Sequence, residues 1–376
     1  MKTTTYDVIV AGGGVIGACI AWRLGQAGRR VLLLERGKIG MGASSAAAGM
    51  LGAQLEMDKP GPLYRLGLES RSMYRAFADE LFEETGIDIQ LADNGTLRLA
   101  LGEEEAERLR LRGAWQTESG ARAQWLTPAE TARLEPLLGP TYGALHLPDD
   151  GNVAAPLLSQ ALAAAARIRT DVMEGAEVLS YRVDGKGVVV NTLDAVFQAE
   201  FFILAAGAWS GGVAGTPSLP ARVGPVKGQL LSIRPAGSLR LQRTAFAEGI
   251  YLVPKRDGSI IAGATEEHDA RFQNDVTVEA VFSLLKAARA VAPGLANAAF
   301  ERAWLGFRPT TPSSLPLTGP DPVYPQLIYA VGHYRNGILL TPVTGKMIAE
   351  AVDGGSWPEH WRAFRPGTTQ DAQAIN

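Results

Sequence analysis

The chain has 376 residues, 46% of them hydrophobic, which is enough for roughly two or three domains with large buried cores. Its 36 basic and 39 acidic residues give a formal net charge of -3, so strong electrostatic attraction to nucleic acid or to an anionic membrane is excluded. A single cysteine, Cys19, excludes an internal disulfide and a CxxC redox pair, and four dispersed histidines predict no metal site.

The first residues, MKTTT, lead directly into an apolar segment without the hydrophobic region of a signal peptide. The densest apolar run, Phe201–Trp209, has the length of a strand and falls well short of the roughly 18 residues that cross a bilayer. We therefore expect no membrane attachment and a cytoplasmic location.

The segment Tyr6–Glu35 is typical of a dinucleotide-binding βαβ unit. An apolar strand over 7–11 precedes Gly12, Gly14 and Gly17, which stand in a GxGxxG spacing. The first glycine permits a tight turn, the second lets the backbone approach a pyrophosphate, and the third lets the helix pack on the strand. The helix expected over 15–26 would direct free N–H groups at phosphate.

An acidic residue completes this unit. Glu35 ends the next strand, 23 residues after Gly12, close to the roughly 20 at which a carboxylate reaches the ribose hydroxyls. The acid argues against a 2′-phosphate ligand, although Arg36 beside it weakens that argument. The alternative is a glycine-rich turn in an ordinary α/β protein, but the complete order of strand, turn, helix, strand and acid favours a dinucleotide.

Small residues dominate the next segment, 40–54 (GMGASSAAAGMLGAQ). Ser44 and Ser45 precede a run of alanines and predict the N-cap of a second helix whose terminus faces the same pyrophosphate. Met50 and Leu51 favour close packing over a disordered linker.

Periodicity predicts three amphipathic helices, over 68–85, 103–114 and 154–167, and strands over 187–192 and 200–204. The second of these strands leads to Gly207, where the backbone can approach a ligand.

The pattern changes over 225–264 to strands separated by turns, with a hairpin at 255–259, KRDGS. The last part, 327–352, returns to strand, glycine-flanked turn and helix. Antiparallel sheet inserted between dinucleotide-binding segments predicts a second, discontinuous domain.

Taken together, GGGVIG with Glu35, SSAAAGML, VKGQ, YLVP, GAT, GFRPTTP and GHYRNGILLTP resemble the glycine oxidases of the D-amino-acid oxidase and sarcosine oxidase superfamily. The resemblance covers nearly the whole chain. It implies an α/β fold with a Rossmann-like, GR2-type FAD-binding domain (1–83, 150–222 and 307–376). It also implies a discontinuous α+β substrate domain on an antiparallel sheet (84–149 and 223–306).

The same resemblance implies FAD rather than NAD, and oxidative deamination of glycine, sarcosine or D-alanine. Hydride transfer to the flavin gives an imine, then glyoxylate and ammonia, with H2O2 formed from O2. FAD should be bound non-covalently, because Cys19 lies on the first helix. Formation of the thiazole of thiamine and a homotetramer are further implications.

The cofactor-binding residues that the resemblance implies extend the fingerprint to four further segments. They are Gly12, Gly14, Val15, Ile16, Gly17, Glu35, Arg36, Ala43, Ser44, Ser45, Ala48, Gly49, Met50, Val178, Gly207, His333, Tyr334, Arg335, Asn336, Gly337, Ile338 and Leu339.

Arg308, in GFRPTT, is the predicted partner of a substrate carboxylate, because a guanidinium offers two parallel donors. The alternative is a surface arginine paired with a nearby acid. Tyr251 is expected to donate to the same carboxylate, with a core tyrosine as the alternative. Arg335 is expected to favour the anionic reduced flavin. Arg308, Tyr251 and Arg335 form the predicted catalytic set.

Met50 and Glu266 are the remaining substrate-binding candidates. Core packing is the alternative for Met50. Glu266 stands where the family has an apolar residue, and it pairs with the substrate ammonium only if it faces the pocket. Apart from Glu266 and His333, the candidates include no good proton acceptor near neutral pH, so no essential general base is expected.

Other functions stay open at this point. Within the superfamily they are a sarcosine oxidase and a D-amino-acid oxidase or dehydrogenase. From other classes they are the flavin component of a tRNA-modifying enzyme, which the lack of a basic patch disfavours, and a non-catalytic dinucleotide-binding protein. Small amines and O2 are the expected partners.

Overall fold

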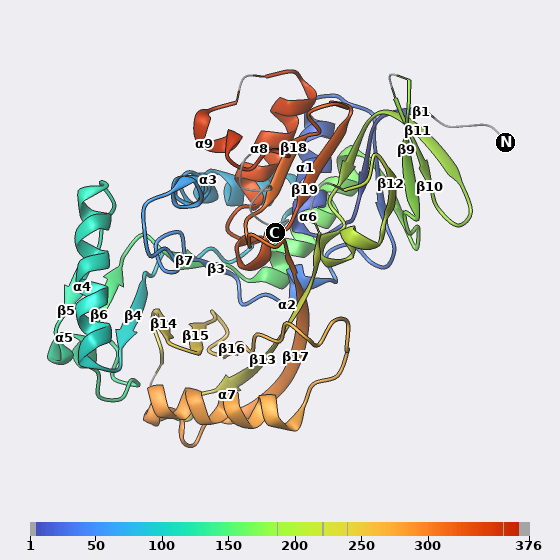
Figure 1. Ribbon diagram of the computed structural model, residues 1–376. Coiled ribbons are helices and arrows are strands. Elements are labelled where there is room, and N and C mark those ends of the chain that lie inside the picture. Colours follow the sequence, from blue (N-terminus) through green and yellow to red (C-terminus); the bar gives the residue numbers. More distant parts are fainter. Residues whose placement is uncertain (1–4, 186, 220–221, 239, 356, 368–376) are drawn as a thin grey trace.

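Two β-sheets organise the chain in the computed structural model, which describes residues 5–185, 187–219, 222–238, 240–355 and 357–367. One sheet has nine strands and the other has eight (Figure 1). A two-stranded ribbon pairs β3 (Met50–Leu51) with β7 (Gly151–Asn152). The α/β class is confirmed, and the second sheet is antiparallel except for one parallel pair, between the strands Thr96–Ala100 and Thr244–Ala247.

The nine-stranded sheet is built on the opening βαβ unit. Its central strands are parallel: β8 (Asp171–Glu174), β2 (Val31–Glu35), β1 (Thr5–Ala11), β11 (Val196–Leu204) and β19 (Leu327–Val331). The edges are completed by β10 (Gly187–Asn191), β9 (Ser180–Asp184), β12 (Ala214–Thr216) and β18 (Leu317–Pro320). Residues of β1 and β2 are buried on both faces, as the continuous apolar runs predict.

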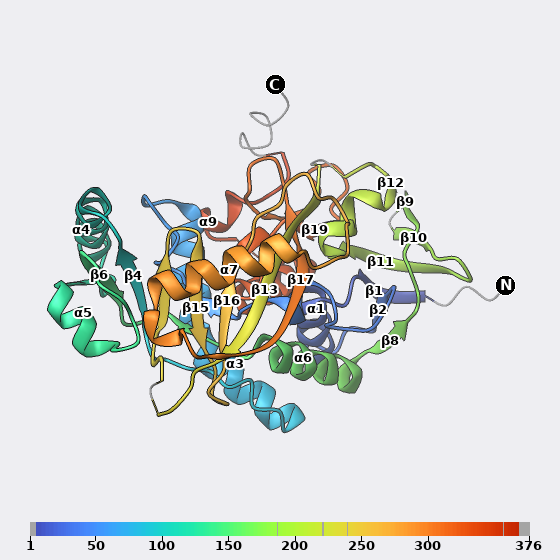
Figure 2. The same ribbon diagram turned by 90° about the horizontal axis from the view of Figure 1, so that it is seen from below.

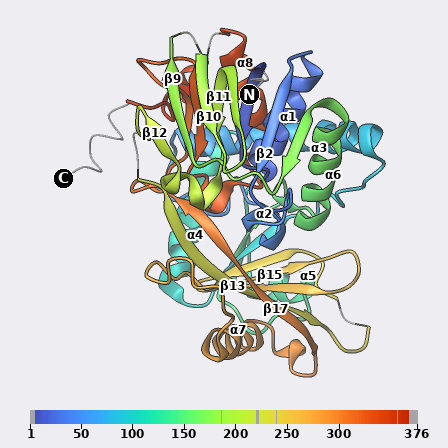
Figure 3. The ribbon, with the colours of Figure 1, turned by 90° about the vertical axis from the view of Figure 1, so that its right-hand side faces the viewer.

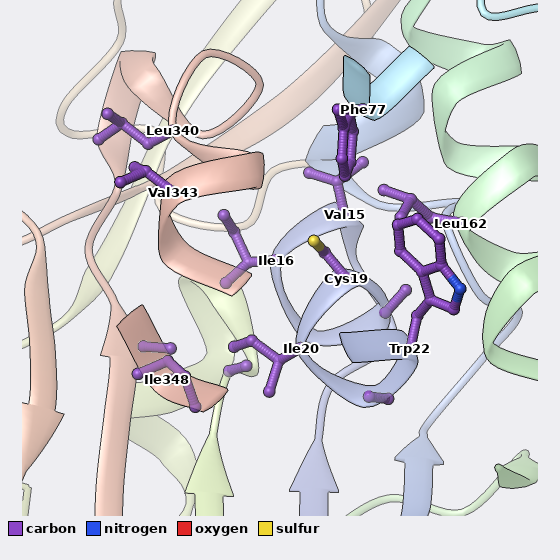
Figure 4. Packing of buried hydrophobic residues seen from close by; sticks show 14 of the residues in the cluster. Val15, Ile16, Cys19, Ile20, Trp22, Phe77, Leu162, Leu340, Val343 and Ile348 are labelled. Atoms are coloured by element: carbon purple, nitrogen blue, oxygen red, sulfur yellow. The ribbon is translucent and has the colours of Figure 1, made fainter. Parts of the chain in front are cut away.

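Helices cover one face of this sheet. α1 (Val15–Gln26) contacts α6 (Ala155–Arg169) and α8 (Thr341–Val352), and α3 (Pro62–Thr85) packs against the last two. Figure 4 shows the side chains of α1 meeting those of the neighbouring helices. Cys19 is fully buried there, and burial raises the pKa of its thiol to about 12, so it is an inert core residue.

The eight-stranded sheet comes from two separate parts of the chain. Its order is β17 (Ala299–Thr310), β13 (Gly224–Arg234), β16 (Ile260–Gly263), β15 (Ile250–Pro254), β14 (Thr244–Ala247), β4 (Thr96–Ala100), β6 (Gly143–Leu147) and β5 (Gln124–Leu126). α7 (Val278–Val291) packs on β13, β15 and β16 (Figure 2), while α4 (Glu103–Glu118) and α5 (Pro128–Leu134) pack at the β4–β6 end. The long strands β13 and β17 rise toward the first sheet (Figure 3).

Short elements complete the chain. They are α2 (Ala43–Ala46), α9 (Glu359–Arg362) and the 3₁₀ turns η1 (Gly207–Gly212), η2 (Pro293–Leu295) and η3 (Tyr334–Asn336). Within the described ranges, no helix has both the length and the apolar composition that a bilayer span requires.

The expected helices are confirmed with shifted ends. The helix predicted over 68–85 begins at Pro62, because Gly61 and Pro62 supply a start signal that the apolar periodicity alone does not carry. The other two run to Glu118 and Arg169, four and two residues beyond the predicted ends.

Candidate active site

An elongated cavity of about 1120 Å³ runs from the carboxyl ends of β1 and β2 to strands β15 and β17 of the other sheet. Typical small-molecule pockets measure roughly 300 to 1,000 Å³, so this cavity has room for an extended ligand and a small second molecule. Its position outside the carboxyl ends of parallel strands is the usual ligand site of such sheets.

Two glycines of the turn at one end of the cavity, Gly12 and Gly17, have no space for a side chain. Gly12 has φ +105°, and a Cβ there would lie 2.4 Å from the Ala205 oxygen. A Cβ on Gly17 would lie 1.9 Å from the Gly12 oxygen. The carboxylate of Glu35 accepts hydrogen bonds from the N–H groups of Gly13 (2.7 Å) and Gly37 (2.8 Å). Glu35 therefore stabilises the glycine turn through these hydrogen bonds, and it also lines the cavity.

The predicted N-cap at Ser44 and Ser45 is wrong. Both residues lie inside the four-residue helix α2, whose N-cap is Gly42, so α2 offers no long dipole to a phosphate. The Ser44 hydroxyl instead accepts a hydrogen bond (3.0 Å) from the N–H of Val15, the first residue of α1. A distant segment thus satisfies a donor at the start of α1, and this long-range contact is invisible in local sequence patterns.

Aromatic side chains line the cavity near Arg36, and sequence reasoning missed them. The guanidinium of Arg36 lies 3.8 Å from the centre of the Trp209 ring. Trp209 stacks on Phe272 with ring centres 5.0 Å apart, and both rings meet Phe307 edge-on. The only signal was Trp209 itself, two residues after Gly207.

Arg308 and Tyr251 stand together at the opposite end. Arg308 lies on β17 across from Val226, and its Nη1 donates to the Thr265 carbonyl oxygen (3.0 Å). Among the described residues, no carboxylate lies within 4 Å of this guanidinium. Tyr251 on β15 is 7% exposed, and burial raises the pKa of its hydroxyl, so the hydroxyl is a donor at neutral pH.

Two glycines give these side chains their room. A Cβ on Gly228 would lie 2.4 Å from Nη1 of Arg308, and a Cβ on Gly263 would lie 2.8 Å from the Tyr251 hydroxyl. The glycines of VKGQ and GAT therefore belong to the site because they make space, and neither contributes a functional group.

Arg335 has a different environment, between two carboxylates. Its Nε and Nη2 donate to Glu56 (2.8 Å each), and its Nη1 donates to Glu266 (3.0 Å). Glu266 also accepts a hydrogen bond from the Tyr334 hydroxyl, and it lies 3.2 Å from Nε2 of His268. Burial opposes the charge of Glu266, but Tyr334 and Arg335 lower its pKa, so it is ionised.

His333 is buried, although it contributes to the cavity lining. Its Nε2 lies 3.0 Å from the Thr344 hydroxyl, and burial lowers the pKa of the imidazole to about 4. The imidazole is therefore neutral at physiological pH and serves as a structural hydrogen-bonding group.

The structure brings most predicted residues to the cavity wall. The lining includes Gly12, Gly14, Val15, Ile16, Glu35, Arg36, Ala43, Ser44, Ser45, Ala48, Gly49, Met50, Val178, Gly207, Tyr251, Arg308, His333, Tyr334, Arg335, Gly337 and Ile338. Four predicted residues are not part of it: Gly17, Glu266, Asn336 and Leu339.

Each of these four residues has another contact. Gly17 lies under the Gly12 carbonyl, and Leu339 is 3% exposed in the helical core. The Asn336 N–H donates to the His333 oxygen, and Glu266 binds Arg335 without lining the cavity. Glu56, which lines the cavity, was missed because nothing in its local sequence separates it from a surface acid.

Comparison with known proteins identifies the family. The profile of the FAD dependent oxidoreductase family (DAO) matches residues 7–351. The chain belongs to this family. A glycine oxidase of Geobacillus kaustophilus is 42% identical over 93% of this chain and 94% of its own length. The crystal structure of glycine oxidase from that species superposes with a TM-score of 0.92 at 40% identity, covering 97% and 99% of the two chains.

A second kind of relative is the Bifunctional protein ThiO/ThiG of Nostoc sp., which is 35% identical over 93% of this chain and 53% of its own length. The expected resemblance to glycine oxidases is confirmed, and so is the expected cofactor class: this oxidoreductase depends on FAD.

The residues present fit FAD. Gly14 and Gly207 leave open space at the turns, since a Cβ on Gly207 would meet no atom within 4 Å and one on Gly14 would meet only the Ser44 hydroxyl at 3.2 Å. Glu35 offers acceptors for ribose hydroxyls, and the N-terminus of α1 offers N–H donors for a pyrophosphate. Cys19 does not line the cavity, so it is not an attachment point for the flavin.

Replacing Glu35 with alanine is expected to weaken FAD binding by about 1.5 to 3 kcal/mol, the size of hydrogen bonds to a charged group. Quenching of FAD fluorescence during titration of the apoprotein measures the change. Glu35→Gln should lose less, because its oxygen still accepts from a turn N–H. Unchanged affinity in the alanine variant would contradict the ribose role.

Proposed function

We propose that this enzyme oxidises glycine, sarcosine and D-alanine to the corresponding imines. Water hydrolyses the imine of glycine to glyoxylate and ammonia, that of sarcosine to glyoxylate and methylamine, and that of D-alanine to pyruvate and ammonia. The observation that carries the proposal is the Arg308 guanidinium, which has no carboxylate within 4 Å among the described residues and lies at the cavity end beside the Tyr251 hydroxyl. A small zwitterion supplies the missing carboxylate.

The relatives support this substrate class. Proteins named glycine oxidase are 31% to 42% identical to this chain over more than nine-tenths of its length. The ThiO/ThiG relatives support a role in forming the thiazole of thiamine, which we propose as the physiological use of the imine. We further propose a cytoplasmic homotetramer, divided into the FAD-binding and substrate domains that the sequence predicts.

Arg308 and Tyr251 orient the substrate. When bound, FAD would supply the hydride acceptor, with O2 as the final oxidant that is reduced to H2O2. Arg308 donates two parallel hydrogen bonds to the substrate carboxylate, and Tyr251 donates a third. These three bonds fix the orientation of the substrate and therefore of its α C–H bond. Met50 and Trp304 contribute apolar wall that excludes water from the substrate end.

Arg335 supports the site in another way. Burial opposes its charge, but Glu56 and Glu266 raise its pKa above that of an ordinary arginine. Because two carboxylates already compensate its charge, we assign the carboxylate of the substrate to Arg308. Arg335 holds Glu56 and Tyr334 in place around the substrate, the latter through Glu266.

A panel of amines tests the proposed function. Purified enzyme is incubated with glycine, sarcosine, D-alanine, L-alanine and a bulky D-amino acid, and both O2 consumption and H2O2 are measured. We expect turnover of the first three with one H2O2 per O2. Oxidation that proceeds only with an artificial quinone acceptor would identify a dehydrogenase instead.

Tyr251→Phe is expected to cost only about 0.5 to 1.5 kcal/mol in kcat/KM, the size of one hydrogen bond, rather than the 100-fold or more of a lost general base. The pH profile of kcat/KM should rise as the substrate amine loses its proton. His333 adds no step between pH 5 and 9, because its imidazole is already neutral there. Loss of flavin reduction in Glu266→Gln or His333→Ala, with FAD still bound, would reveal a base.

A further inference from the structure

Lys255 does not line the cavity, but it links the hairpin of Tyr251 to the segments beside Met50 through three hydrogen bonds. Its Nζ donates to the carbonyl oxygens of Ala48 (2.7 Å) and Val153 (3.0 Å) and to Oδ1 of Asn152 (3.0 Å). Ala48 lines the cavity shortly before β3, and Asn152 lies on β7, which pairs with β3, and is followed by Val153, whereas Lys255 belongs to the turn between β15 and β16 of the second sheet.

The geometry matches an ammonium group. Its three N–H bonds meet three oxygens, and no carboxylate of the described residues lies within 4 Å of Nζ, so the contact is directional and has no ion-pair partner. Burial lowers the pKa of the amine to about 7, yet the neutral amine keeps two N–H donors for the same oxygens.

The residues on each side of this contact are adjacent to proposed substrate-binding residues: Lys255 follows the strand of Tyr251, and Asn152 pairs with Met50. Tyr251, Val253 and Lys255 alternate along one strand direction, so their side chains point to the same side of the hairpin. Val253 and Tyr251 share a buried cluster with Ala48, and Met50 packs against it. Met50 is paired with Asn152 in the β3–β7 ribbon.

We propose that Lys255 is a positioning residue that sets the width of the substrate end by clamping the Tyr251 hairpin to the ribbon that carries Met50. Without the clamp, the Arg256 side chain of this turn still donates to Asp88 and to the Leu91 carbonyl oxygen, but these acceptors do not lie on the ribbon that carries Met50. Among the described residues, the other contact between the Tyr251 hairpin and Met50 is apolar packing, which has no fixed direction. A displacement of about 1 Å can cost roughly 100-fold in rate, so a small shift is sufficient to matter. The inference rests on the proposed function, because it assumes a small carboxylate ligand at Arg308.

The test compares Lys255→Met with Lys255→Arg in the FAD-loaded enzyme. We expect the methionine variant to raise both KM for glycine and the Kd of acetate by about tenfold, the latter read from the flavin absorption spectrum without turnover. FAD content should be unchanged and kcat should change less than KM. Lys255→Arg should recover most of the loss, because its guanidinium still donates to carbonyl oxygens.

Arg256→Met is the matched control. Arg256 is the next residue on the same turn, and it forms an exposed ion pair with Asp88 (2.6 Å) and donates to the Leu91 carbonyl oxygen (3.4 Å), but it has no hydrogen bond to Ala48, Asn152 or Val153. It should leave KM and the acetate Kd unchanged. Asn152→Ala removes one of the three acceptors of Lys255 and should also raise KM for glycine and the Kd of acetate. This variant tests the proposal if Lys255→Met does not fold.

A lower thermal stability of Lys255→Met with KM and acetate Kd within twofold of wild type would overturn the proposal, since the residue would then be structural only. The same result in Asn152→Ala would also overturn it. A wild-type enzyme that binds acetate but does not oxidise glycine would refute the proposed function and leave the acetate comparison as the test of the clamp.

Discussion

Replacing Arg308 with alanine is expected to raise KM for glycine by the equivalent of about 2 to 5 kcal/mol, or roughly 30-fold to 5,000-fold. The reason is that the substrate carboxylate would enter the cavity end without the guanidinium that lies beside Tyr251. Steady-state kinetics with glycine, together with the absorbance ratio that reports FAD content, measures the effect. FAD content should not change, because Arg308 is at the end of the cavity opposite Glu35.

Arg308→Lys separates charge from geometry. Lysine keeps the charge and loses the two parallel donors, so it should restore KM only partly. Arg182→Ala, on an exposed ion pair with Asp184, is the control and should have no effect. If Arg308→Ala binds glycine almost normally, the carboxylate site lies elsewhere, and Arg335 would be the next candidate despite its two acidic partners.

The opening βαβ unit could be predicted because its signals are local. Strand burial, turn glycines and the acid at the end of β2 all lie within 30 residues of one another, and each follows from backbone geometry. Arg308 and Tyr251 were found through family motifs. The physical reason for those motifs, the space that Gly228 and Gly263 leave for the two side chains, appears only in the structure.

Long-range contacts explain what sequence reasoning missed. Glu56 reaches Arg335 across 279 residues, and Lys255 reaches Ala48 across 207. Neither residue has a local pattern that distinguishes it from a surface charge, since Lys255 stands in a turn sequence, KRDGS, that is typical of exposed hairpins. The role of Ser44 was misread for the same reason: its partner, Val15, lies in another segment.

Replacing Gly17 with alanine is expected to destabilise the folded protein by about 3 kcal/mol and to leave little FAD in the purified enzyme. Alanine favours a helix over glycine by up to about 1 kcal/mol, but that gain is smaller than the cost of the clash. The new Cβ would lie 1.9 Å from the Gly12 oxygen, and a backbone atom of the tight turn cannot move away as a flexible side chain can. Thermal unfolding of the apoprotein and its FAD content measure the two effects.

Gly14→Ala is the matched control, and it separates the two roles that the sequence assigns to the glycines. Its Cβ would meet only the Ser44 hydroxyl, at 3.2 Å, so the apoprotein should unfold at nearly the wild-type temperature. FAD affinity should still fall, because the methyl group would occupy the space through which a pyrophosphate approaches the backbone. If Gly17→Ala proves as stable as Gly14→Ala, the contact between α1 and the glycine turn is looser than the structure indicates.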